Sequence, residues 1–229
     1  TTELSRFQNL SQSGHLDLAR VLASPDIDFL CSPCQYFYRH DEAPFSYSQV
    51  LGPFSCAGAD LGKLAYLEDD HPPVYTRSAA PDFTTRDAWH DEMFFRRTLA
   101  QVASHGQQLW WYSLGAGWLK EPQRQAVVAR MHQVGLEAQR RDRTSVAQVA
   151  VVIDERAVAP MRLNAAFQQA LILDSVAACF PAGAPIACHE LSLFLRHADP
   201  RRYRFVYFPN LGWMDDETRA ALARWQGGG

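Results

Sequence analysis

Short apolar runs and longer amphipathic segments alternate along the first part of the chain. Residues 27–31, 63–67 and 107–114 are apolar runs near turn-forming or polar residues, a pattern typical of buried strands. Residues 86–104 and 122–141 place apolar side chains at helical spacing, and a glycine or a proline marks one end of each. Strands and helices in this succession predict a parallel sheet. We therefore expect an α/β fold with its chemistry in the loops after the strands.

The same alternation restarts after the charged stretch 140–143, which has the character of a linker. We therefore expect two α/β domains, residues 1–143 and 144–229. The second domain is predicted to contain strands at 146–153, 184–188 and 203–208 and helices at 164–179 and 215–225. The chain opens on two threonines and closes on three glycines, from which we expect a piece of a longer protein.

Composition narrows the class of protein. Hydrophobic residues make up 47% and charged residues 21%, and the net charge is -3, which argues against a nucleic-acid surface or a basic membrane patch. The 5 cysteines do not suit a disulfide framework, and Cys31-x-x-Cys34 lacks the second ligand pair of a zinc site. The sequence contains no Gly-rich phosphate loop. We expect no metal, no cofactor, no nucleic-acid partner and no membrane association.

Glu68 is the strongest candidate for chemistry. It stands at the C-terminal end of an apolar strand, where a barrel presents its catalytic groups, and it could serve as nucleophile, general base or metal ligand. The alternative is a solvated acid at a strand end. Asp69 and Asp70 follow it, but successive side chains of a strand point to opposite faces, so the three are not expected to meet at one cation without a turn.

Aromatic residues near the strand ends favour a carbohydrate ligand. Tyr36 follows the first strand, Trp110 and Trp111 lie in the third, and Trp118 lies just beyond it. Flat aromatic faces suit the C–H faces of sugars. Alternation predicts that one of the paired tryptophans packs under the helices while the other faces the pocket. Arg39 could hold a substrate carboxylate or the strand-end acid, or it could be an ordinary surface residue.

Several of these segments resemble the β-galactosidases of glycoside hydrolase family 42, which belong to clan A and have a TIM barrel. The second part of the chain is similar to the flavodoxin-like trimerisation domain of that family. The segments that carry the resemblance are 28–33, Tyr36, Arg39, 63–70, Trp110 and Trp111 in the first part, and 149–154 and 203–211 in the second. The resemblance implies a partial TIM barrel, with its last strands ending at Cys31, Glu68 and Tyr112, followed by a truncated flavodoxin-like domain.

The resemblance also implies a function. A glutamate at the end of the seventh barrel strand is the nucleophile of retaining β-galactoside hydrolysis in that family, and Glu68 matches it. A tyrosine after the sixth strand contacts the nucleophile, and Tyr36 is the nearest match. The remaining substrate-binding candidates are Arg39, Asp69, Trp110, Trp111 and Trp118.

This chain differs from family 42 at one essential position. The acid/base glutamate of the fourth barrel strand has no counterpart here. We therefore expect the chain alone to be inactive on aryl glycosides and to associate through its open barrel edge. The full-length protein is expected to form a homotrimer, by analogy with the family.

Two other interpretations are open at this point. The first is a non-catalytic carbohydrate-binding or assembly module, in which the aromatic rim binds sugar and Glu68 is merely polar. The second is a phosphate-binding or flavodoxin-like protein unrelated to sugars, which the missing phosphate loop disfavours.

Overall fold

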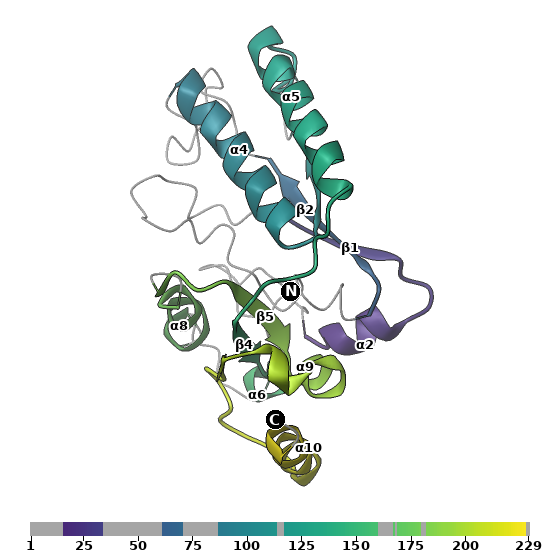
Figure 1. The fold of residues 1–229 in the computed structure, drawn as a ribbon, viewed down its shortest axis with the longest axis vertical. Helices are drawn as coiled ribbons and strands as arrows, with labels where there is room; N and C mark the ends of the chain where they lie inside the picture. The colour runs from purple at the N-terminus through teal and green to yellow at the C-terminus, as the bar shows by residue number, and fades with distance from the viewer. Residues whose placement is uncertain are drawn as a thin grey trace. The chain divides into compact units, whose positions relative to one another are not determined.

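The computed structural model describes residues 16–33, 61–70, 87–113, 117–159, 167, 169–179 and 182–227 (Figure 1). Tyr36 and Arg39 lie outside these residues. The described helices and strands are α2 (Leu18–Ala23), β1 (Phe29–Pro33), β2 (Leu64–Asp69), α4 (Ala88–Ser104), β3 (Gln108–Trp111), α5 (Pro122–Gln139), β4 (Val149–Ile153), α6 (Glu155–Val158), η4 (Gln169–Asp174), α8 (Ser175–Ala177), β5 (Ile186–Glu190), α9 (Leu191–His197), η6 (Pro200–Arg202), β6 (Phe205–Tyr207) and α10 (Asp216–Gly227).

The strands form two parallel three-stranded sheets, which confirms the predicted α/β fold. The first sheet has the order β1-β2-β3, and the second has the order β5-β4-β6 with β4 in the centre. Neither sheet closes into a barrel within the described residues. The predicted helix at 164–179 differs from the structure, which has the π-helix η4 and the short helix α8 in its described part.

The chain folds as two compact units. Among the described residues, the first unit holds 16–30, 61–65 and the residues from 146 onward, and the second holds 31–33, 66–70, 87–113 and 117–145. β1 and β2 each begin in the first unit and end in the second. The domain boundary at residue 143 stays a prediction.

In the second unit, α4 and α5 bury one face of the sheet. α4 starts after Asp87, whose side chain accepts a hydrogen bond from the His90 N–H at 2.7 Å. The helix ends before Gly106, which has the positive φ of 69° that suits a glycine. The buried side chains between the helices and the sheet are Phe95, Leu99, Val127 and Met131, with Leu109 and Trp111 of β3 packed against them.

In the first unit, β4 is the buried centre of the second sheet. Its residues 150–152 are fully buried, as expected of a central parallel strand covered on both sides. Phe194 of α9 packs in one buried cluster with Ala150 and Val152 of β4, and its ring centroid lies 4.9 Å from that of Trp225 in α10 and 5.9 Å from that of Tyr203. Phe194 is therefore the centre of an aromatic core that holds the C-terminal helix.

Replacing Phe194 by alanine tests this core. Phe194 has an exposed fraction of 0%, so Phe194→Ala should lower the free energy of unfolding by about 3–5 kcal/mol through lost burial and a residual cavity. Phe205→Ala is the matched control, since Phe205 is 57% exposed, and it should change stability by less than about 1 kcal/mol. Urea denaturation measures both values, and equal losses would contradict the assigned core.

Candidate functional site

Glu68 lies on the face of the first sheet opposite the helices. In the register of β2 and β3, Glu68 is level with Trp110, and Asp69 is level with Trp111. Side chains alternate between the two faces, so these two pairs point in opposite directions. Trp111 packs on the helical side, where its ring centroid lies 5.5 Å from that of Phe95 of α4. Glu68 and Trp110 therefore share the other face, which we call the open face.

Cys31 of β1 joins Glu68 and Trp110 on the open face. The indole Nε1 of Trp110 donates a hydrogen bond to Cys31 Sγ at 3.1 Å. Burial raises the pKa of the Cys31 thiol above its ordinary value, the hydrogen bond from Trp110 opposes this, and the charge of Glu68 raises the pKa further. The thiol is therefore neutral near pH 7. Each of the three strands thus contributes one side chain to the same small region.

Tyr112 is a member of this face that sequence reasoning did not choose as a site residue. It follows β3 directly, and its N–H donates to the carbonyl of Asp69 at 2.9 Å, which continues the hydrogen bonds between β2 and β3. Its ring centroid lies 5.2 Å from that of Trp110, with the planes inclined by 33°. Tyr112 stands two residues after Trp110, so the alternation that separates Trp110 from Trp111 also places Tyr112 beside Trp110.

The other predicted site residues lie elsewhere. Asp69 is buried and Trp111 is packed against α4, so the structure does not bring them together with Glu68 on the open face. Trp118 belongs to the turn after β3, where its N–H donates to Ser113 Oγ at 3.1 Å. Sugar contacts by these three residues stay predictions. The roles of Tyr36 and Arg39 also stay predictions, because both lie outside the described residues.

A buried ion pair holds the turn that carries Trp118. Arg124 Nε and Nη2 of α5 donate to the two carboxylate oxygens of Asp91 in α4, at 2.9 and 3.0 Å. Arg124 Nη1 also donates to the carbonyl of Trp118 at 3.3 Å, and its guanidinium lies 4.8 Å from the ring centroid of Phe95. A two-point hydrogen bond of this kind is geometrically specific, so Arg124 fixes both helices and the turn at the C-terminal end of β3.

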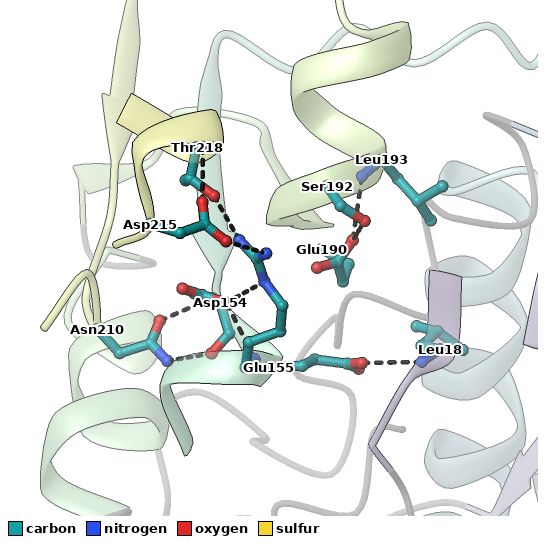
Figure 2. Close-up of polar contacts among 10 residues, drawn as sticks. Leu18, Asp154, Glu155, Glu190, Ser192, Leu193, Asn210, Asp215 and Thr218 are labelled. Atoms are coloured by element: carbon teal, nitrogen blue, oxygen red, sulfur yellow. Dashed lines mark hydrogen bonds and ion pairs between the residues drawn. The ribbon is translucent and has the colours of Figure 1, made fainter. Parts of the chain in front are cut away.

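Figure 2 shows a second polar cluster, at the C-terminal ends of β4 and β5 in the first unit. Its carboxylates accept hydrogen bonds from backbone N–H groups at or near the starts of helices. These bonds are Arg156 N–H to Asp154 at 2.9 Å, Leu193 N–H to Glu190 at 3.0 Å, Thr218 N–H to Asp215 at 2.7 Å and Leu18 N–H to Glu155 at 2.8 Å. Such caps satisfy donors that a helix leaves unpaired, so this cluster stabilises the unit.

The side chains of Asn210 and Arg156 make further contacts within the same cluster. Asn210 exchanges two hydrogen bonds with the backbone of Asp154, at 2.9 and 2.7 Å, and so ties the segment after β6 to the end of β4. Arg156 Nη1 lies 3.0 Å from a carboxylate oxygen of Asp215. Asn210 and Asp215 are far from Asp154 along the chain, so residue spacing in the sequence gives no sign of these contacts.

The described residues contain no group of three or more His, Cys, Asp and Glu side chains arranged to hold a metal ion. Among the described helices, none is both long and apolar enough to cross a bilayer. The chain matches no protein-family model, no curated protein and no solved structure. The interpretation of the open face therefore depends on its own geometry.

The raised pKa of Glu155 should make the stability of the first unit depend on pH. Burial raises its pKa from 4.5 to about 7, and the hydrogen bond from the Leu18 N–H opposes the rise. Between these two values the folded chain keeps a proton that the unfolded chain has lost, so the free energy of unfolding should fall as the pH rises through this range. At about pH 8, Glu155→Gln should be more stable than the parent chain by about 1–3 kcal/mol.

Urea denaturation of both chains at about pH 5 and about pH 8 measures this effect. Glu217→Gln is the control, because Glu217 is exposed on α10 and should leave the pH dependence unchanged. The account of Glu155 is wrong if Glu155→Gln keeps the full loss of stability between the two pH values.

Proposed function

We propose that this chain is part of a retaining glycoside hydrolase of the β-galactosidase-like kind, with Glu68 as the nucleophile. The observation that carries the proposal is the position of Glu68. It lies on the sheet face opposite α4 and α5, in register with the exposed Trp110. Retaining hydrolysis uses a carboxylate as its nucleophile, and a flat aromatic face beside that carboxylate suits the C–H face of a bound sugar.

The first sheet supports a TIM-barrel origin. Its strands follow one another in sequence order, β1-β2-β3, and α4 lies between β2 and β3 in the chain, as in a (β/α) barrel. In such a barrel the helices cover the outside and the other face of the sheet lines the interior. Catalytic groups occupy the C-terminal ends of the strands. Glu68 is the penultimate residue of β2 and meets both requirements.

The second sheet supports a flavodoxin-like second domain. Its order β5-β4-β6 places the first of its strands between the second and the third, as at the start of the flavodoxin order 2-1-3-4-5. The trimerisation domain of family 42 has this kind of fold, so we include homotrimer formation by the full-length protein in the proposal. The fold is shared by many unrelated proteins, so the assignment is an analogy.

The chemistry assigned to Glu68 is attack on the anomeric carbon. The bond from that carbon to the leaving oxygen breaks, a second carboxyl group about 5–5.5 Å from the first protonates the leaving oxygen, and a glycosyl-enzyme ester forms. The second group then takes a proton from water, which hydrolyses the ester. Trp110 would stack on the sugar. Tyr36, Arg39 and Trp118 are further proposed contacts from the loops after the strands.

Covalent labelling of Glu68 tests this function. The reagent is 2-deoxy-2-fluoro-β-D-galactosyl fluoride, because a good leaving group makes proton donation unnecessary and the fluorine at C2 slows hydrolysis of the ester. We expect peptide mapping by mass spectrometry to find one fluorogalactosyl group on Glu68. Glu68→Gln should carry none.

The same experiment distinguishes the hydrolase from the non-catalytic alternative. A non-catalytic carbohydrate-binding module would bind galactose without becoming labelled, and the exposed Trp110 and Tyr112 are the observation that favours this second candidate. Labelling of another carboxylate, with Glu68 unmodified, would exclude Glu68 as the nucleophile.

A further inference from the structure

The second unit contains a cavity between α4, α5 and β3, which we call the α4–α5 cavity. Its volume is about 100 Å³, and it is partly open to solvent. Leu109 and Trp111 of β3 line it, together with Gln107 just before the strand. Residues at this spacing share one face of a sheet, and here it is the face that α4 and α5 cover. The sheet therefore separates the cavity from Glu68 on the open face.

The walls of the cavity are apolar where the two helices face each other. α4 contributes Leu99 and Val102, and α5 contributes Met131 and Gly135. A Cβ atom added at Gly135 would lie 3.8 Å from Leu99 Cδ1, an ordinary contact, so the glycine leaves room in this wall. An apolar cavity of about 150 Å³ is large enough to hold benzene. The α4–α5 cavity therefore suits a smaller apolar group, of about four or five carbon atoms.

The cavity also has a polar side with a positive charge. Gln107 is 5% exposed, and its side-chain amide forms no hydrogen bond within the described residues. Arg143 lines the cavity as well, and its Nη1 donates to the Gln107 carbonyl at 3.3 Å. No Asp or Glu lines the cavity, and Arg143 forms no ion pair within the described part of the chain. The guanidinium therefore has N–H groups left for an acceptor on a ligand.

We propose that the α4–α5 cavity binds a short-chain monocarboxylate of about four or five carbon atoms. Its alkyl chain would lie between the apolar walls of α4 and α5, and its carboxylate would accept hydrogen bonds from the Arg143 guanidinium and the Gln107 amide. Burial of CH₂ groups supplies affinity, whereas the charge-assisted hydrogen bond to arginine selects the anion. This site is independent of the proposed hydrolase function, because it lies on the other face of the sheet.

A series of ligands of increasing length tests the fit. Acetate, propanoate, butanoate and pentanoate are titrated into the whole chain at about pH 7, with 1-pentanol as the neutral match of pentanoate, and NMR chemical shifts measure the dissociation constants. Affinity should rise about fourfold for each added CH₂ group, and pentanoate should bind about tenfold more tightly than 1-pentanol. Equal affinities for acetate and pentanoate, or no binding of pentanoate, would overturn the proposal.

Replacing Arg143 tests the selection of an anion. Arg143→Gln should weaken pentanoate about tenfold and leave 1-pentanol within about twofold, whereas Arg143→Lys should keep part of the preference for the anion. Arg141→Gln is the matched control, since Arg141 is exposed and does not line the cavity, and it should change neither affinity. A full preference for pentanoate in Arg143→Gln would overturn the role of Arg143.

Filling the cavity tests where the alkyl chain lies. Gly135→Leu should abolish binding of both pentanoate and 1-pentanol, and leucine favours a helix more than glycine does, so α5 should stay folded. Ala103→Leu fills the cavity from α4 and should have the same effect. Gln133→Leu places the same side chain at an exposed position of α5 and should leave both affinities unchanged.

Circular dichroism identifies the filling variants that are folded. Binding that survives in a folded Gly135→Leu or Ala103→Leu chain would place the ligand outside the α4–α5 cavity and overturn the proposal.

Discussion

The alternation of side chains along β2 and β3 is the constraint that defines the open face. α4 and α5 bury one face of the sheet through Leu109 and Trp111, so the residues one step away point to the other face. Glu68 and Trp110 are level with each other and share that second face. A slip of one residue would turn Glu68 toward the apolar helices, where a carboxylate loses its hydration at a large cost. Helix packing thus fixes the direction of the carboxylate.

Carboxylates at strand ends have different surroundings in the two units. Asp154, Glu155 and Glu190 are buried near the ends of β4 and β5, and each accepts a backbone N–H at or near the start of a helix. Their side-chain oxygens accept these donors and so hold the helices in place. Glu68 instead shares a face with an exposed aromatic pair and a neutral thiol. This contrast is why the proposed chemistry is assigned to the open face.

Local patterns in the sequence predict the strands and the longer helices, because apolar periodicity and turn residues act over a few positions. The π-helix η4 was missed, since its hydrogen-bonding pattern has no periodic signature that separates it from an α-helix. Alternation predicted that Trp110 and Trp111 would point to opposite faces, but only the packing of α4 shows that Trp111 is the one on the helical side and that Tyr112 lies beside Trp110. The partners of Asp154 and Glu155 depend on tertiary contacts with Asn210 and Leu18.

The pKa of the Cys31 thiol tests most directly whether Glu68 lies on the open face. It can be measured from the pH dependence of iodoacetamide alkylation, followed at the peptide that contains Cys31. Because the charge of Glu68 raises this pKa, Glu68→Gln should lower it, while Glu121→Gln, at an exposed position before α5, should leave it unchanged. An unchanged Cys31 pKa in Glu68→Gln would contradict the shared face and, with it, the assignment of Glu68 as the nucleophile.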